Sequence, residues 1–359
     1  MQERLFSTRC LIFTDHQVFW ECRDASWCEE KLLETSTAFR YEHALQKRFF
    51  LTTEFQKRAA PTHIESSTIG EFEDYIKEYT DRKLSFDGDG LNAFMGVLEF
   101  FESVGNLSTF WGLPIPKFES ALCWYNTGAV KSRKENSFPS WSWFSSQSAV
   151  EVMVLDQGWH LIHAHRIRRS RDGITFVTIG SHQTPHHPIY HGSPLPMQER
   201  ECPAINDLSP QSMMCVKENF HIVFRSATAT LGIGGIRSLD DYFYTELYMP
   251  SFPTANTKGL IRYQKSIYKS QGLSDHAIGF CFGGVDDDQL ITGDDEHIRF
   301  VLLSQSSRNA HPYPSLRKPF LAMLVIWNTS GVCRRVGLCM VEEKHWLSLD
   351  LEKRLVIMG

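Results

Sequence analysis

The histidines are the side chains in this sequence that are best suited to bind a metal ion or to move a proton. His160, His163 and His165 lie in one apparent strand, in which His163 and His165 share a face because alternate residues of a strand do. A second group lies in a segment rich in Pro, His and Ser, and consists of His186, His187 and His191. A zinc site needs three or four converging ligands, and no cysteine or carboxylate stands at a recognisable spacing from these histidines. We therefore interpret them as surface residues and expect no metal and no cofactor.

Four arginines gather at the expected tip of a β-hairpin: Arg166, Arg168, Arg169 and Arg171. Such a cluster can bind a phosphate group or an acidic partner. A charged hairpin end that keeps a sheet edge soluble accounts for the same residues.

The glycine-rich and acidic stretches do not match a nucleotide or calcium motif. In "LGIGGIRS", Arg237 stands where the third glycine of G-x-G-x-x-G belongs, so we expect a flexible turn there. The segments 87–90 and 286–296 are acidic but lack the Gly and Glu positions of a calcium loop, and we expect solvated turns. We assign no catalytic, cofactor-binding or metal-binding residue, although a triad can assemble from residues dispersed in the sequence.

The segment "PSWSWFSS", residues 139–146, is the most unusual motif. Pro139 is expected to start an extended stretch, in which Trp141 and Trp143 project to the same face. Two neighbouring indoles bury a large apolar area, and each indole N–H needs a partner. The pattern favours a structural anchor, with a binding platform as the alternative.

Composition narrows the class of protein. The chain has 359 residues, and its net charge of -5 argues against a general nucleic-acid-binding protein. Its nine cysteines are odd in number and never spaced as C-x-x-C, which indicates a reducing compartment without a disulfide framework. The longest apolar run, "FLAMLVIW" at 320–327, is too short to span a bilayer. We expect a soluble cytoplasmic protein with no nucleic-acid partner and no membrane span.

Hydrophobic periodicity predicts an α+β fold, in which an α-rich N-terminal part precedes an antiparallel β-rich part that resembles a sandwich or an open barrel. Two strands, "CLIF" and "QVFWEC", form a hairpin within residues 1–23, after a helix end at 3–7. In the α-rich segment 24–138, Thr68 and Glu71 suggest a capping box. A second helix carries its apolar face on Leu91, Phe94, Met95, Leu98 and Phe101, and a short helix covers about 118–125. Residues 139–359 form the β-rich region, with a flexible insertion at 181–212.

An ordered series of motifs resembles the fungal heterokaryon incompatibility (HET) protein family. "QERLFSTRCLIFTDHQVFWEC" is similar to the motif that closes the HET domain, through Gln2, Glu3, Leu5, Arg9, Trp20, Glu21 and Cys22. "YIKEYTDRKLSFDGDGLNAFMGVLEFF" is similar to a later region, through Tyr79, Arg82, Leu84, Asp89, Leu91, Ala93 and Gly96. "FWGLPIPKFESALCWY", "FPSWSWFS" and "CRRVGLCMVEEKHWLSLDLEKRLVIMG" resemble the signatures that follow. The series spans nearly the whole chain.

The resemblance implies a role in nonself recognition and programmed cell death. It also implies that most of the HET domain precedes this sequence, so that residues 1–23 are the terminal remnant of that domain. Any TIR-like chemistry of the family would lie in the missing part, so no catalytic residue is carried over. Glu3 and Arg9 match the motif, and we expect them to hold the helix end against the hairpin.

These observations lead to one expected function and two alternatives. We expect the C-terminal interaction or regulatory portion of a HET protein, which binds a protein partner of an incompatibility system. The first alternative is an enzyme, a hydrolase or an NAD-consuming activity, whose site is dispersed in the sequence. The second is a nonfunctional truncated remnant, whose hairpin at residues 10–22 lacks its sheet partners.

Overall fold

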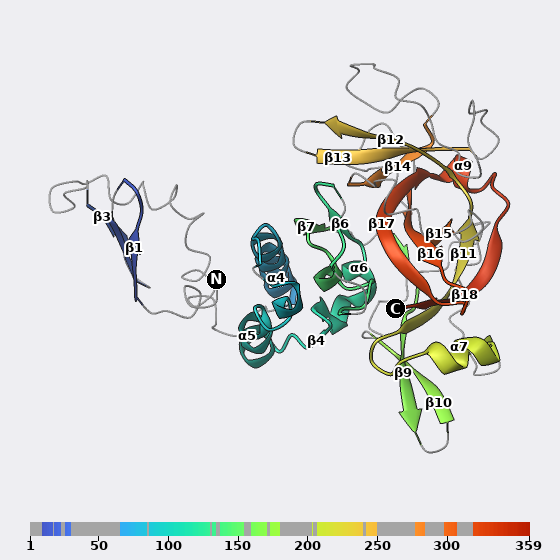
Figure 1. Cartoon of the computed structure of the whole chain (residues 1–359), viewed down its shortest axis with the longest axis horizontal. Helices are drawn as coiled ribbons and strands as arrows, with labels where there is room; N and C mark the ends of the chain where they lie inside the picture. The colour runs from blue at the N-terminus through green and yellow to red at the C-terminus, as the bar shows by residue number, and fades with distance from the viewer. Residues whose placement is uncertain are drawn as a thin grey trace. The chain divides into compact units, whose positions relative to one another are not determined.

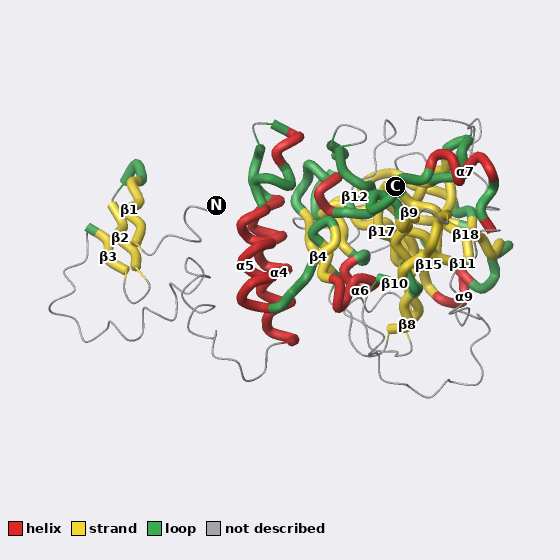
Figure 2. Tube along the Cα trace, turned by 90° about the horizontal axis from the view of Figure 1, so that it is seen from below, coloured by secondary structure: helices red, strands yellow, loops and turns green. Residues whose placement is uncertain are grey.

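The computed structural model describes residues 9–16, 18–22, 26–29, 65–84, 86–129, 131–133, 137–153, 159–170, 173–179, 203, 207–239, 242–249, 277–283, 298–306 and 319–359. Its contacts divide the chain into two units, Met1–Glu71 with Leu91–Leu107 and Phe72–Gly90 with Ser108–Gly359. The elements are a set of helices and a large, mostly antiparallel sheet (Figures 1 and 2), which confirms the predicted α+β class. None of the helices in these ranges is long and apolar enough to cross a membrane.

The first unit contains a small antiparallel sheet in the order β1-β2-β3. The predicted hairpin is confirmed as β1 (Arg9–Phe13) and β2 (Val18–Cys22). A third strand, β3 (Ser26–Cys28), was not predicted. Trp20 is central in this sheet, because it lies opposite Leu11 on one side and Trp27 on the other. The predicted helix end at residues 3–7 lies outside the described residues.

Two longer helices follow, and their starts differ from the predicted ones. Helix α4 (Glu65–Thr80) begins three residues before Thr68, so Thr68 lies inside the helix and the predicted capping box is wrong. Helix α5 (Met95–Gly105) is capped at its C-terminus by Asn106, which has a left-handed φ of 49°. Its first residue, Met95, is 38% exposed although it was predicted to face the core.

Short elements connect the helices to the large sheet. They are η3 (Asp87–Asp89), β4 (Thr109–Phe110), β5 (Leu113–Pro114), η4 (Ile115–Lys117), α6 (Phe118–Ala121), β6 (Trp124–Asn126), η5 (Trp143–Ser145) and β7 (Val150–Val152). The helix predicted for 118–125 therefore ends at Ala121. Trp124 instead begins strand β6, which pairs with β7 in antiparallel register.

Among the described residues, eleven strands form the large sheet. They are β8 (Trp159–Leu161), β9 (His165–Ser170), β10 (Gly173–Thr178), β11 (Ile222–Ala229), β12 (Gly232–Leu239), β13 (Tyr242–Tyr248), β14 (Gly279–Phe282), β15 (Ile298–Ser306), β16 (Pro319–Trp327), β17 (Cys333–Glu342) and β18 (Glu352–Met358). Their order is β10-β9-β11-β15-β16-β17-β14-β13-β12, with β8 on β15. Strands β12 and β13 were not predicted, and the single strand predicted across His160, His163 and His165 is wrong, because residues 162–164 separate β8 from β9. "LGIGGIRS" was predicted to be a flexible turn, and it forms β12, whose register shift between Ile233 and Ile236 accommodates the two glycines.

The pairing of five strands closes into a ring. Strand β11 pairs with β15, β15 with β16, and β16 with β17, and β18 then pairs with both β17 and β11. These strands curve around one another at the right of Figure 1. Every residue of β16 from Pro319 to Ile326 is buried, which explains its unbroken apolar sequence. The main core includes Phe300, Leu324 and Trp346.

The end of the predicted flexible insertion is helical. Residues 181–202 lie outside the described part, whereas Pro210–Cys215 form helix α7. The side chain of Ser209 accepts the N–H of Ser212 at 3.0 Å and caps this helix. The prediction of a flexible segment is therefore wrong for residues 210–212. A further short helix, α9 (Glu343–Trp346), follows β17.

Candidate functional site

The "PSWSWFSS" segment forms a turn and not an extended strand. Ser142 accepts the N–H of Phe144 at 3.2 Å through its hydroxyl, which donates to the carbonyl oxygen of Trp111 at 2.7 Å. The backbone N–H of Ser145 then donates to the carbonyl of Ser142 at 3.0 Å. Because serine hydroxyls bond to nearby backbone groups, they favour such turns over strand geometry. The predicted alternation is therefore wrong, and Trp143–Ser145 within the segment form the short helix η5.

Each indole of this region has a hydrogen-bond acceptor. Trp141 donates to the carbonyl of Phe220 at 3.0 Å, and Trp143 donates to the carbonyl of Gly112 at 2.8 Å. Trp124 donates to the carbonyl of Trp141 at 2.8 Å. Trp141 and Trp143 are fully buried. These contacts favour the structural anchor over the binding platform, because the ring faces and the polar N–H groups are already used within the chain.

A buried arginine completes this cluster, which we call the tryptophan junction and define as Trp124, Trp141, Trp143 and Arg335. Arg335 is 4% exposed, and its guanidinium donates to the carbonyls of Leu122, at 2.5 Å, and of Trp124. The same guanidinium lies 4.0 Å from the centre of the Trp124 ring. Burial lowers the pKa of Arg335 to about 10, so the side chain keeps its charge at neutral pH.

The junction joins three segments that are distant in sequence. The backbone N–H of Arg335 donates to the Ser140 hydroxyl at 2.9 Å. Ser140 in turn donates to the carbonyl oxygen of Gly359, from its backbone N–H at 3.0 Å and from its hydroxyl. The motif around Ser140, strand β17 and the end of β18 are thereby held together. The sequence places Arg335 in a motif but does not indicate its burial, because its acceptors are carbonyls that every residue carries.

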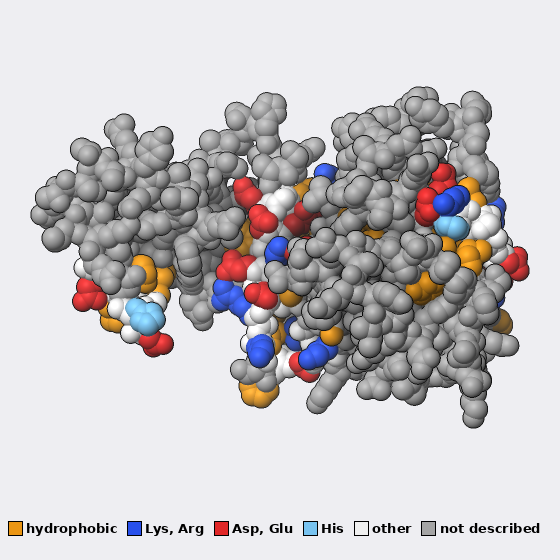
Figure 3. All heavy atoms as spheres, turned by 90° about the horizontal axis from the view of Figure 1, so that it is seen from above, with side chains coloured by type: hydrophobic (Ala, Val, Ile, Leu, Met, Phe, Trp, Pro, Cys, Tyr) orange, Lys and Arg blue, Asp and Glu red, His pale blue; other side chains and the backbone are white. Residues whose placement is uncertain are grey.

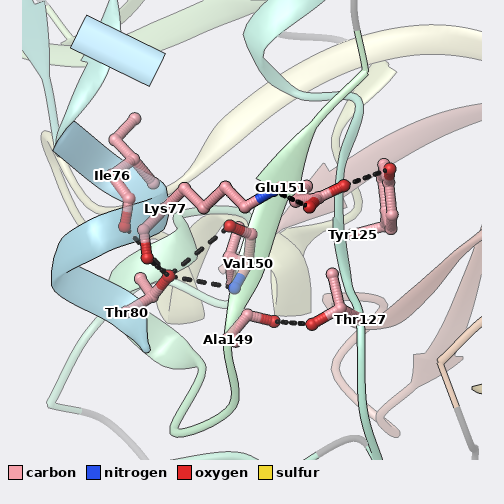
Figure 4. A network of polar contacts seen from close by, with 8 residues as sticks. All are labelled: Ile76, Lys77, Thr80, Tyr125, Thr127, Ala149, Val150 and Glu151. Carbon is pink, nitrogen blue, oxygen red and sulfur yellow. Dashed lines mark hydrogen bonds and ion pairs between the residues drawn. The ribbon is translucent and has the colours of Figure 1, made fainter. Parts of the chain in front are cut away.

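A second polar network connects helix α4 to the β6–β7 hairpin (Figure 4). The Thr80 hydroxyl accepts the N–H of Val150 at 2.9 Å and donates to the carbonyl of Ile76 at 2.9 Å. Lys77 forms an ion pair with Glu151, which also accepts the Tyr125 hydroxyl at 2.8 Å. Thr80 is buried and Lys77 is exposed, so the hydroxyl contributes more to the stability of this contact than the ion pair does.

The structure separates the histidines that the sequence groups together. His160 lies in β8, His163 in the connection that follows, and His165 at the start of β9. His165 is buried, so its interpretation as a surface residue is wrong. Among the described residues, no group of three or more His, Cys, Asp or Glu side chains is arranged to hold a metal ion. The other three histidines and the acidic segment 286–296 lie outside the described residues.

The arginine cluster is partly engaged within the chain. Arg169 on β9 donates to the carbonyl of Met213 at 3.1 Å and to that of Val216 at 2.7 Å, at the end of helix α7. This contact satisfies carbonyls that a helix end leaves without a partner. Arg171 lies outside the described residues. The acidic turn at 87–90 also contacts other parts of the chain. The Asp87 carboxylate lies 3.6 Å from the Arg133 guanidinium and accepts a hydrogen bond from the Gln147 side-chain amide at 2.8 Å.

The β1–β2–β3 sheet presents apolar side chains to solvent. Leu11 is 57% exposed and Phe13 is 73% exposed, and both lie on the same face of β1 because they are two residues apart. We call Leu11 and Phe13 the hairpin patch. Hydrophobic side chains are visible where this hairpin lies, at the left of Figure 3. The opposite face of β1, with Cys10 and Ile12, is only half-buried.

Comparisons of the chain with protein-family models, with curated proteins and with solved structures found no match.

Proposed function

We propose that this chain is the C-terminal interaction portion of a HET-type incompatibility protein, and that the hairpin patch contacts the HET domain. The observation that carries this proposal is the exposure of Leu11 and Phe13 on a strand whose sequence matches the motif that closes that domain. The ordered motifs along the chain supply the link to the family.

The physical argument starts from the size of the sheet. A sheet of three short strands is marginally stable unless one face is packed against other structure. Within the described residues, β1 is an edge of its sheet, and an edge strand offers backbone groups to which a further strand can pair. An apolar edge strand therefore fits a protein partner that covers Leu11 and Phe13 and extends the sheet.

The binding test uses the full chain and a HET domain expressed as a separate polypeptide. We expect isothermal titration to show binding, and we expect the double variant Leu11→Thr with Phe13→Thr to weaken it at least tenfold, because threonine keeps β propensity but removes apolar area. Met214→Thr is the matched control, since Met214 is 86% exposed on helix α7. Equal affinity of the double variant and wild type would contradict the proposed contact.

A cell-based test addresses the role of the chain. Regulated expression of this chain alone in a fungal cell should leave growth unchanged, because the death-inducing domain is the binding partner and not the chain itself. Death on induction of the chain alone would contradict the proposal.

A further inference from the structure

Strands β14 and β17 place two buried cysteines directly opposite each other. Cys281 and Cys339 are partners in the antiparallel register, and both are almost fully buried in the main core. The N–H of Glu342 donates to the carbonyl of Ile278 at 3.0 Å, so these two residues, just before β14 and at the end of β17, occupy a hydrogen-bonded position of the same ladder. Such pairs alternate with non-hydrogen-bonded pairs along an antiparallel ladder. Three positions further along, Cys281 and Cys339 therefore form a non-hydrogen-bonded pair.

This pair type suits a covalent link. The Cα atoms of a non-hydrogen-bonded pair lie about 4.5 Å apart and the side chains are at their closest, within the range that a disulfide requires. Burial raises the pKa of the Cys339 thiol, and the neighbouring Cys281 thiol raises it further, which is consistent with two thiols that face each other across the ladder. The reduced pair can be oxidised without a large movement of either strand.

A glycine next to the pair permits this close approach. A Cβ atom at Gly279 would lie 2.2 Å from the carbonyl oxygen of Met340 and 2.8 Å from the Cα of Val341. Real Cβ atoms do not approach backbone this closely, so any larger residue at position 279 would push β14 away from β17. The glycine thus permits β14 and β17 to lie close together next to the two cysteines.

A positive charge lies beside the pair. The Arg335 guanidinium interacts electrostatically with Cys281, Cys339 and Cys123. Burial raises the pKa of Cys339, and the guanidinium opposes that rise because it favours the thiolate. The thiolate is the form that reacts with an oxidant.

We propose that Cys281 and Cys339 are a reversible oxidation site, at which hydrogen peroxide closes a disulfide between β14 and β17. One thiolate attacks the O–O bond and becomes a sulfenic acid, and hydroxide leaves and takes up a proton as water. The second thiol then displaces the sulfenic oxygen as a second water, and the S–S bond forms. The two sulfurs lose two electrons, which reduce one peroxide to two waters. A small neutral oxidant suits the site because neither thiol is exposed.

The disulfide would attach the β12–β13–β14 edge of the sheet covalently to β17. Strand β14 lies between β17 of the closed ring and β13, which carries β12 at the far edge. Closing the disulfide joins this edge to the ring covalently and leaves the pairing register unchanged. The inference rests on the register and burial of β14 and β17 and is independent of the proposed function.

The experiment treats the folded full chain with hydrogen peroxide, alkylates the remaining thiols and identifies linked peptides by mass spectrometry. We expect a peptide that joins Cys281 to Cys339 and that dithiothreitol reverses. Cys123 and Cys333 are the internal controls, since both are buried and Cys333 lies opposite Trp327 and Met358. Alkylation of all four buried cysteines as thiols, under conditions that oxidise the exposed Cys215, would overturn the proposal.

A stability measurement gives a second readout. Oxidation should raise the melting temperature of wild type by roughly 5 °C, because the link closes a long loop. Cys281→Ala should abolish this rise and Cys123→Ala should keep it. A rise of the same size in Cys281→Ala would also overturn the proposal.

Discussion

The guanidinium of Arg335 lies over the ring of Trp124 at 4.0 Å and donates to that residue's own carbonyl oxygen. One cation therefore binds both the side chain and the backbone of a residue 211 positions earlier in the sequence. Trp124 begins β6 and Arg335 lies in β17, so this contact joins the β6–β7 hairpin to the ring of strands. Its acceptors are uncharged, so the geometry of the contact depends on hydrogen bonds and ring stacking and not on a carboxylate.

Arg335→Ala is expected to destabilise the protein strongly. The substitution leaves the carbonyls of Leu122 and Trp124 buried without their donor and removes the cation–π contact, so we expect a loss of about 3–5 kcal/mol in the free energy of unfolding. Urea denaturation measures this loss. Arg354→Ala is the control, because Arg354 pairs with Glu352 at the surface and should cost less than about 1 kcal/mol. Equal losses in the two variants would contradict the role of Arg335.

Gly112→Ala is expected to disturb the tryptophan junction from the opposite side. Gly112 has a φ of +75°, and a Cβ atom there would lie 2.6 Å from the Phe144 ring and 3.0 Å from the Trp143 ring. The strained backbone alone costs about 1–2 kcal/mol, and the contact with two buried rings adds to it. Thermal unfolding followed by circular dichroism should show a clear drop in melting temperature. Gly128→Ala has open space around it and should leave the melting temperature almost unchanged.

Much of the sheet could be predicted because a strand that is buried on both faces has an apolar sequence along its length. The residues of β16 and most of β17 are buried, so the sequence of β16 is a continuous apolar run and that of β17 is apolar from Val336 to Val341. The closure of the ring could not be predicted in this way. It depends on the pairing of β18 with β11, whose residues lie more than a hundred positions away in the sequence. The apolar pattern of a strand does not indicate which other strand it pairs with.

Only two of the four residues of the tryptophan junction, Trp141 and Trp143, were predicted, and their geometry was predicted wrongly. Trp141 and Trp143 were expected to be buried on one face of a strand, and the hydroxyl of Ser142 instead stabilises a turn. The burial of Arg335 could not be predicted, because its guanidinium binds backbone carbonyls and no acidic residue in the sequence marks it as paired. Strand β12 was missed for a related reason, since its glycines are typical of turns and a bulge accommodates them in a strand.

Thr80→Val tests the network between α4 and the β6–β7 hairpin. Valine keeps the shape of threonine but leaves the N–H of Val150 without an acceptor in a buried position, so we expect a loss of about 1–3 kcal/mol in the free energy of unfolding. Thr127→Val is the matched control (Figure 4). The Thr127 hydroxyl only donates, at 3.5 Å, to the carbonyl of Ala149, which already accepts the N–H of Thr127 at 3.1 Å. Similar losses in both variants would show that the Thr80 hydroxyl has no special role.

Glu119 is expected to make stability depend on pH around neutrality. Burial raises the pKa of its carboxyl to about 7, although hydrogen bonds from its own backbone N–H and from that of Ala164 favour the charged form. The folded state therefore keeps a proton that the unfolded state has already released between about pH 4.5 and pH 7. The free energy of unfolding falls as the pH rises through this window, and the cost is fully present above pH 7.

Glu119→Gln removes that titration. Relative to wild type, the variant should gain roughly 1–3 kcal/mol between pH 5 and pH 8, because an amide carries no charge to bury. Urea denaturation of both proteins at the two pH values measures the gain, and Glu102→Gln at an exposed site of α5 controls for the loss of one negative charge. A gain in Glu102→Gln as large as that in Glu119→Gln would mean that overall charge, and not the burial of Glu119, sets the pH dependence.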